Sequence, residues 1–260
     1  MANYQPINPD SVSGWYWQAP AHYLGASELG HLSLSPTEVY PAACVMPVAF
    51  SRRGKRMEPV AIVGQQADVN LFVGPKGQWL GRYVPGMLRH PPFELVATGS
   101  GESALCVDLD SEWLSRSEGE AFFDGNEPSA ALQRVLAELK RWKGERASPM
   151  RAMMDALEAH ELLRPWPLTF TAPDGREIVH EGLYQIDTDR LNGLNGGALE
   201  ALHRIHVLPM IYAHRLSTFH LHLLDRLAAA HANWHRTHRS GIPDKWFGDR
   251  GDEFTFDFDR

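Results

Sequence analysis

Histidine is the residue type in this sequence with the most obvious chemical potential. The 260 residues include 13 histidines, and an imidazole can ligate a metal or transfer a proton near neutral pH. Glu200 and His203 form a Glu-x-x-His pair, whose members share one face of a helix and can share a metal, as in di-iron bundles. A second such pair, Glu177 and His180, lies in a predicted strand, where residues three apart point to opposite faces. Only the first pair therefore remains a candidate for metal ligation.

Three more histidines follow near the end of a long predicted helix. His231 and His235 are one turn apart, a spacing that lets two imidazoles reach one metal, and His238 follows three residues later. No acidic residue lies among them, and the surrounding sequence "RTHRSG" adds positive charge that repels a cation. The alternative is that the helix has left the core by this point, so that these histidines are ordinary surface residues.

His214 and Ser217 lie one turn apart on the same predicted helix, near the edge of its apolar arc. As a base and a nucleophile they would suit covalent catalysis. The favoured alternative is that they form hydrogen bonds from the helix to a sheet and so satisfy buried polar groups. His214 also enters a metal-enzyme hypothesis, in which a non-haem iron-like centre would use His203 and His214 with Glu200 or Asp108.

The segment "GRYVPGMLRHPPFEL", residues 81–95, concentrates further candidates. Its three prolines restrict the backbone, so Arg82 and Arg89 are expected on a stiff platform beside Tyr83. Two arginines with an aromatic ring suit a carboxylate or phosphate ligand. The favoured alternative is an internal ion pair, for which the candidate acids are Asp108, Asp110 and Glu94.

The elements that must position these residues follow from the apolar pattern. Apolar, β-branched segments separated by turn residues predict antiparallel hairpins in the N-terminal half. One is expected at 45–50 and 59–64, a second at 69–79 and a third from "FELVAT" to "SALCVDL". Helical spacing then predicts several helices from residue 128 onward, with another hairpin around residue 174. The last helix is expected from about 209 to 239 and is apolar over most of its circumference, which is typical of a buried helix.

These patterns predict an α+β fold: an antiparallel meandering sheet in the N-terminal half, packed against several helices and one long buried C-terminal helix. We expect an extended aromatic arm over 1–36, a single domain over 37–240 and an acidic-aromatic tail over 241–260. The net charge of −7 argues against nucleic acid as a partner. No segment approaches the ~18 apolar residues of a membrane span, and the N-terminus does not resemble a secretory signal. A cytoplasmic location is therefore expected.

Several ordered motifs resemble the SapC family of bacterial proteins. They include "NLFVGPKGQWLGRYVPGMLRHPPFEL", "GEAFFDGNEPSAAL", "PLTFTAPDGREIVHEGLYQID", "LHRIHVLPMIYAHRLS" and the ending "FTFDFD". The resemblance spans about residues 36–228 and the tail. It does not include the late histidines of the long helix. Combined with the pattern analysis, it favours these residues for ligand or partner binding: Arg82, Tyr83, Arg89, Asp108, Tyr184, His214 and Ser217.

The resemblance implies an association with certain genes, and it does not imply a catalytic activity. The family takes its name from bacterial surface-array (S-layer) genes, and it is unrelated to a transporter permease that shares the name. Related genes often lie beside TonB-dependent receptors, halogenase-like enzymes and cupin-like oxygenases. We therefore expect a non-catalytic accessory protein without a cofactor, which binds a peptide or a halogenase-like or cupin-like enzyme. The rivals are the metal-dependent enzyme, with iron or zinc, and a homodimer joined through the long helix or the tail.

Overall fold

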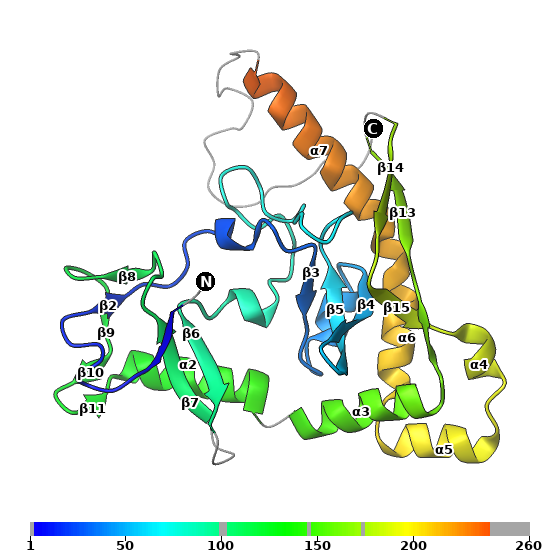
Figure 1. Ribbon diagram of the computed structural model, residues 1–260, viewed down its shortest axis with the longest axis horizontal. Coiled ribbons are helices and arrows are strands. Elements are labelled where there is room, and N and C mark those ends of the chain that lie inside the picture. Colours follow the sequence, from blue (N-terminus) through cyan, green and yellow to red (C-terminus); the bar gives the residue numbers. More distant parts are fainter. Residues whose placement is uncertain (1–2, 99–102, 145–146, 173–174, 240–260) are drawn as a thin grey trace.

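A computed structural model describes residues 3–98, 103–144, 147–172 and 175–239 of the chain. It confirms a mixed α+β fold with antiparallel strands and a long C-terminal helical run (Figure 1). The strands are divided among several sheets, which pack around two separate hydrophobic cores. The predicted tail over 241–260 lies outside the described residues.

The larger core surrounds a five-stranded sheet in the order β12-β15-β4-β5-β3. Its centre is the predicted hairpin, which pairs Val48 with Ala61 and turns at Gly54, whose positive φ of 62° favours glycine. Side chains such as Phe50 and Ile62 are fully buried in this core. The strands of the sheet are β3 (His31–Ser33), β4 (Val48–Arg53), β5 (Arg56–Ile62), β12 (Leu163–Pro165) and β15 (Leu183–Ile186).

The smaller core lies beneath strands that include part of the first 36 residues. Trp17, Phe93 and Phe122 are buried there, and the rings of Trp17 and Phe93 meet edge to face with centroids 4.8 Å apart. The strands form sheets in the orders β1-β7-β6, β8-β2-β9 and β10-β11. They are β1 (Tyr4–Pro6), β2 (Tyr16–Trp17), β6 (Phe93–Ala97), β7 (Ser103–Asp108), β8 (Leu114–Ser115), β9 (Glu120–Ala121), β10 (Phe123–Asp124) and β11 (Glu127–Pro128).

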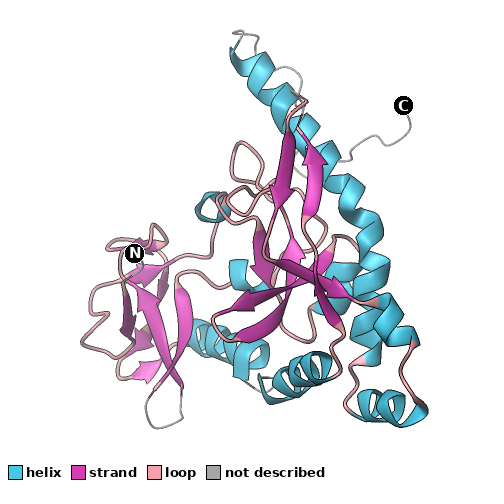
Figure 2. Ribbon diagram, turned by 45° about the vertical axis from the view of Figure 1, so that its right-hand side comes forward, coloured by secondary structure: helices cyan, strands magenta, loops and turns pink. Residues whose placement is uncertain are grey.

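Helices cover the sheets on the sides that would otherwise expose apolar residues. In Figure 1, α2 passes behind β6 and β7 of the smaller core, and α3 lies below the sheet of the larger core. The hairpin of β13 (Leu168–Thr171) and β14 (Glu177–His180) runs beside α7 in Figures 1 and 2. The α-helices are α1 (Val39–Ala43), α2 (Ala130–Leu139), α3 (Ala147–Ala159), α4 (Thr188–Asn192), α5 (Gly196–Arg204), α6 (Leu208–Ser217) and α7 (Leu221–Arg239). Shorter helical turns are η1 (Leu24–Ala26), η2 (Gly86–Leu88), η3 (Lys140–Gly144) and η4 (Thr218–His220).

The long helical run is confirmed, with one interruption and one correction. The 3-10 turn η4 separates α6 from α7, where the sequence predicts a single helix. Met210 and Ile211 are buried against the sheet, as the periodicity indicates. Tyr212, Leu216 and Phe219 were expected among the buried residues but are exposed, because no described element covers that side of the helix. The run is therefore buried along one face only.

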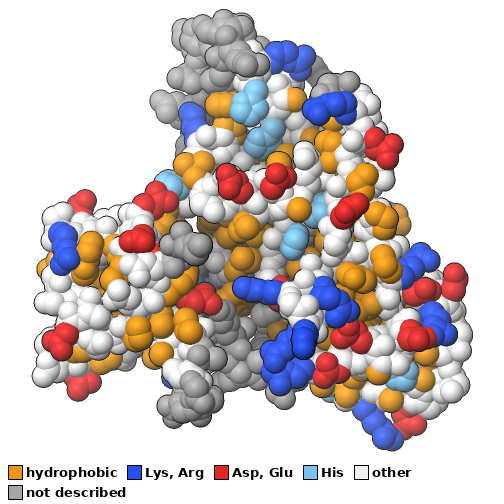
Figure 3. All heavy atoms as spheres, viewed as in Figure 1, with side chains coloured by type: hydrophobic (Ala, Val, Ile, Leu, Met, Phe, Trp, Pro, Cys, Tyr) orange, Lys and Arg blue, Asp and Glu red, His pale blue; other side chains and the backbone are white. Residues whose placement is uncertain are grey.

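Two further expectations are refined. Residues 69–79 form a turn with a single bridge between Val73 and Trp79, and not a pair of strands. The division of the chain at residue 36 stays a prediction, but β1, β2 and β3 pair with strands of three different sheets. Figure 3 shows acidic and basic side chains interspersed over one face of the molecule. Among the described residues, no helix combines the length and hydrophobicity needed to cross a bilayer.

Candidate functional site

A pocket of about 270 Å³ lies where the two cores meet. Tyr83 packs against the larger core and Trp142 packs against the smaller one, and both line the pocket. Ligand sites commonly form at such junctions, because two separately packed units leave space between them. The lining residues are Ser35, Thr37, Glu38, Tyr83, Arg89, His90, Glu138, Arg141 and Trp142.

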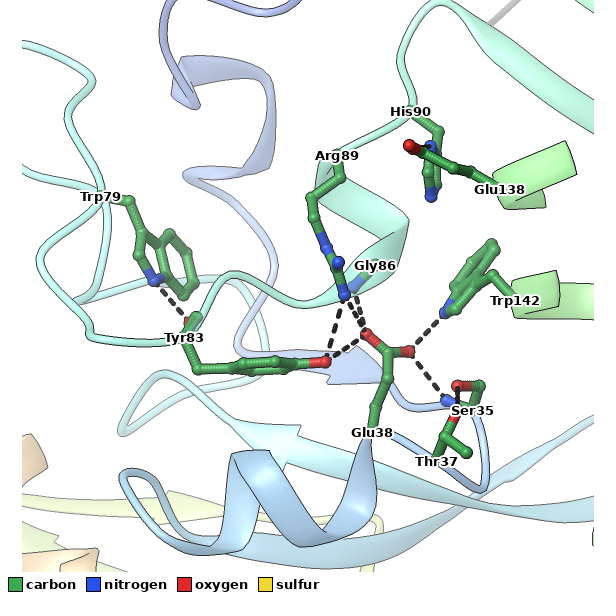
Figure 4. A network of polar contacts seen from close by, with 10 residues as sticks. All are labelled: Ser35, Thr37, Glu38, Trp79, Tyr83, Gly86, Arg89, His90, Glu138 and Trp142. Atoms are coloured by element: carbon green, nitrogen blue, oxygen red, sulfur yellow. Dashed lines mark hydrogen bonds and ion pairs between the residues drawn. The ribbon is translucent and has the colours of Figure 1, made fainter. Parts of the chain in front are cut away.

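The floor of the pocket is organised by the carboxylate of Glu38, which precedes α1 and is almost completely buried. Its Oε1 accepts hydrogen bonds from the Tyr83 hydroxyl at 2.8 Å, the Gly86 N–H at 2.5 Å and Arg89 Nη2 at 3.0 Å (Figure 4). Its Oε2 accepts from the Ser35 N–H at 3.0 Å and from the indole N–H of Trp142. Five donors from three parts of the chain therefore converge on one side chain.

These donors decide the charge of Glu38. Burial by itself would raise the pKa of the carboxyl, because a buried charge loses its hydration. The hydrogen bonds from Ser35, Trp142, Tyr83 and Gly86 outweigh burial and hold the pKa below its usual value. Glu38 is therefore an ionised acceptor with both oxygens already occupied. It is poorly placed to act as a general base, since its lone pairs point at protein donors.

Arg89 connects this buried charge to the pocket. Its guanidinium is about half exposed, while the Glu38 side chain beside it is only 5% exposed. It also donates to the Tyr83 hydroxyl at 3.1 Å and lies 5.5 Å from the centroid of the Tyr83 ring. Burial is the main cause of the raised pKa of Tyr83, and the charge of Glu38 adds to it. Tyr83 therefore stays a neutral hydroxyl that fixes the position of Arg89.

The rim of the pocket carries charges of both signs. Arg141 is exposed in η3, two residues beyond the end of α2. Buried His90 has its Nδ1 4.0 Å from the Glu138 carboxylate, which is exposed (Figure 4). The hydroxyls of Ser35 and Thr37 lie 3.3 Å apart. The pocket thus places Arg141 and Glu138 around the ion pair of Arg89 with buried Glu38.

Only part of the segment 81–95 lines the pocket. Arg89 and Tyr83 belong to the pocket, and the partner of Arg89 is Glu38 and none of the three acids expected from the sequence. Arg82 is exposed and does not line the pocket. Asp108 lies at the end of β7 and accepts the N–H groups of Asn3 and Asp110, at 2.7 and 3.2 Å.

Tyr184 lies in β15, away from the pocket lining. Its ring centroid is 5.9 Å from the guanidinium carbon of Arg52. Arg52 also donates to the Glu158 carboxylate at 2.6 Å. The structure therefore gives Tyr184 an arginine contact of its own, separate from that of Tyr83.

His214 and Ser217 occupy buried positions between α6 and the sheet. Ser217 Oγ accepts the Val48 N–H at 2.9 Å and donates to the His214 carbonyl at 2.6 Å. The His214 ring bonds the Val48 carbonyl through Nδ1 at 2.8 Å and accepts the Ile186 N–H at Nε2, at 3.2 Å. These are the helix-to-sheet hydrogen bonds of the structural alternative, and the serine hydroxyl does not bond the imidazole. Burial lowers the pKa of His214 to about 4, so the ring is neutral.

The residues proposed as metal ligands do not meet. Glu200 pairs with Arg204 at 2.5 Å along α5, and His203 is exposed on the same helix. His231 Nε2 bonds the Leu71 carbonyl at 3.0 Å, whereas His235 is exposed against the Trp234 ring. Within the described ranges, no group of three His, Cys, Asp or Glu side chains could hold a metal ion. The side chain of His238 lies outside what the structure describes.

Sequence reasoning singled out two residues of the pocket, Tyr83 and Arg89, and missed the others, among them Glu38, Arg141 and Trp142. A local signal for Glu38 exists, since Ser35 and Glu38 fit the S/T-x-x-E pattern in which the acid bonds back to the serine N–H. The structure contains that bond. Trp142 lies 104 residues from Glu38, so no local pattern relates the two.

The comparisons with known proteins give a single family. Residues 7–224 match the family model described as SapC. No curated protein and no solved structure matches the chain. The match covers every residue that lines the pocket and all buried residues of the two cores except Leu227.

Proposed function

The chain belongs to the SapC family, and from this premise we propose that it is a non-catalytic binding protein whose pocket beside Glu38 receives a peptide carboxylate. One observation carries the proposal. The buried acid of the pocket is already saturated by protein donors, while two guanidinium groups, of Arg89 and Arg141, line the open space. Such a pocket presents two fixed guanidinium groups to a ligand, while the carboxylate at its floor has no lone pair left for proton transfer. That combination suits recognition of an anion more than its chemical conversion.

Arg89 is prepared for this role by its surroundings. Its ion pair with Glu38 and its bond to Tyr83 hold the guanidinium in one orientation, so little side-chain entropy remains to be lost when a ligand binds. Arginine presents five N–H donors, and only some of them are used by these two contacts. The remaining donors are available on the half-exposed side, which is the side that faces the pocket.

The charge balance of the rim favours a carboxylate over a phosphate. Glu138 lines the same pocket as Arg141, and its negative charge disfavours a dianion more than a singly charged group. The half-buried Trp142 ring supplies apolar surface next to these charges. A carboxylate attached to an apolar residue, at a chain end or in an Asp or Glu side chain, matches this arrangement.

The peptide could be free or part of a larger protein, and we place the encounter in the cytoplasm. We propose that a halogenase-like or cupin-like enzyme, as implied by the family resemblance, carries the peptide segment that binds in the pocket. Arg82 is exposed in the same segment as Arg89 and would contact the partner outside the pocket. No cofactor takes part in this proposal.

The test uses short synthetic peptides made in matched pairs. One member of each pair has its carboxylates, and the other has a C-terminal amide and Asn or Gln in place of Asp or Glu. Peptides selected on the full chain are titrated by calorimetry against the native protein, Arg141→Glu and the matched control Lys140→Glu. Lys140 is the neighbouring exposed cation and does not line the pocket.

We expect the carboxylate form to bind about tenfold more tightly than the amide form, which corresponds to one charge-assisted hydrogen bond. Arg141→Glu should remove this preference, and Lys140→Glu should keep it. If the carboxylate and amide peptides bound with equal affinity, or if Arg141→Glu and Lys140→Glu had equal effects, the pocket would not recognise the carboxylate.

A further inference from the structure

A stripe of apolar side chains is exposed along the outer side of α6 and η4. Tyr212, Leu216 and Phe219, here called the outer stripe, are 51%, 68% and 78% exposed. The other exposed large hydrophobic residues of the described chain do not exceed 46%. The spacing of four and three residues places the three side chains on one helical face at successive turns. The outer stripe is therefore a contiguous patch and not a set of scattered surface residues.

The opposite side of the same helix is fixed in the fold. Met210, Ile211, His214 and Ser217 are buried there, and the last two bond the backbone of β4. The helix cannot rotate to bury the outer stripe without breaking these bonds. The apolar face is thus held outward by polar contacts on its inner face, so any cover must come from another segment.

Basic side chains accompany the outer stripe. Arg215 is exposed between Tyr212 and Leu216, and Arg226 is exposed on the same face two to three turns later. Asp225, the acidic residue beside Arg226, accepts a hydrogen bond from Gln65 at 2.7 Å. The face therefore combines large apolar groups with positive charge, and its natural complement is a segment that combines aromatic rings with acids.

The sequence contains such a segment. "DEFTFDFD", residues 252–259, alternates Phe254, Phe256 and Phe258 with polar or acidic residues. In an extended conformation residues two apart point to the same side, so the three rings would form one apolar edge. This segment lies outside the described residues. We propose that residues 252–259 of the same chain cover the outer stripe, with their acids near Arg215.

The length of the chain permits this contact. The 19 residues of α7 extend about 28 Å, at 1.5 Å per residue. From Arg239 to Phe254 there are 15 residues, which can span up to about 50 Å when extended. The segment can therefore return along the whole of α7 and reach Phe219 and Leu216. A second copy of the chain is not required for the contact.

The test is hydroxyl-radical footprinting of the full chain with mass-spectrometric readout. The native protein is compared with the triple variant Phe254→Ser/Phe256→Ser/Phe258→Ser. The matched control is Trp246→Ser/Phe247→Ser, which removes aromatic rings from the neighbouring sequence but leaves 252–259 intact. Tyr40, which is 41% exposed on α1, reports an uncovered aromatic residue in the same sample. Light scattering at several concentrations gives the oligomeric state.

In the native chain, Tyr212 and Phe219 should be oxidised more slowly than Tyr40, although more of their surface is exposed on the described fold. The triple variant should raise their oxidation about twofold or more, in proportion to the surface uncovered, while Tyr40 and the control variant stay unchanged. The proposal is overturned if Tyr212 and Phe219 are as reactive as Tyr40 in the native chain. It is also overturned if their protection disappears on dilution together with a dimer, because a second copy would then be the cover.

Discussion

Replacing Glu38 by glutamine is the sharpest test of how the two cores are joined. The substitution keeps the size and shape of the side chain and removes its charge. It also converts one of the two accepting oxygens into an NH2 group that can only donate. In the native protein, Oε1 accepts three hydrogen bonds and Oε2 accepts two. Whichever way the amide turns, at least two donors lose their acceptor and face another donor.

The cost follows from the number of donors left without a partner. The less damaging orientation keeps the oxygen toward Tyr83, Gly86 and Arg89, and leaves the N–H groups of Ser35 and Trp142 unpaired. A buried donor without a partner costs about 1–3 kcal/mol. The Arg89 pair contributes less, because its guanidinium is half exposed and solvent screens it. We therefore expect Glu38→Gln to lower the free energy of unfolding by about 4 kcal/mol.

Chemical denaturation of the native and variant proteins measures this change directly. The matched control is Glu138→Gln, since Glu138 lines the same pocket but its carboxylate is 61% exposed. The control should change stability by less than about 0.5 kcal/mol, as exposed surface substitutions do. If Glu38→Gln were no more destabilising than Glu138→Gln, the convergent hydrogen bonds would not join the cores, and our account of Glu38 would be wrong.

Four further predictions can be checked with purified protein. The pKa of His214 is about 4 in the folded protein and about 6.5 in the unfolded chain, so between these values only the unfolded chain binds a proton at this imidazole. The free energy of unfolding therefore falls as pH falls. Denaturation at pH 8 and pH 5 should show a loss of about 2 kcal/mol through this residue. His214→Gln should remove that part of the loss, and His203→Gln, at an exposed site, should not. Gly86→Ala should lower the free energy of unfolding by about 2 kcal/mol, because the new Cβ would lie 2.5 Å from Trp142 Nε1 and 2.8 Å from Glu38 Oε1. The matched control is Gly25→Ala, whose Cβ would meet nothing within 4 Å and which should be tolerated. Mass spectrometry of untagged protein purified without chelators should find no stoichiometric iron or zinc, and a bound equivalent would return attention to the histidines.

The elements with a strong local pattern could be predicted from the sequence. The hairpin of β4 and β5 follows from two β-branched segments and a charged turn with glycine, and the structure pairs Val48 with Ala61 as that pattern requires. The pairing of His214 and Ser217 with the sheet followed from their position at the edge of the apolar arc. In these cases the deciding residues are close together in the chain or share one face of a helix, although the sheet residue that His214 and Ser217 bond, Val48, lies 166 and 169 residues earlier.

Contacts between segments that are distant in the chain could not be predicted from such local patterns. Arg89 was recognised, but its partner Glu38 lies 51 residues earlier and was not considered. The burial of Glu38 depends on donors from residues 83–89 and from Trp142, which only the folded chain brings together. The apolar pattern of α6 and η4 likewise predicts that Leu216 and Phe219 are buried, but the pattern cannot show whether another element covers them.

The most direct measurement for the proposed function is a crystal structure of the full chain with a peptide selected by its carboxylate. We predict that the carboxylate oxygens lie about 3 Å from guanidinium nitrogens of Arg89 and Arg141, with the Glu38 hydrogen bonds intact. If the peptide bound elsewhere on the protein and left the pocket beside Glu38 empty, the central claim that this pocket recognises the carboxylate would be wrong.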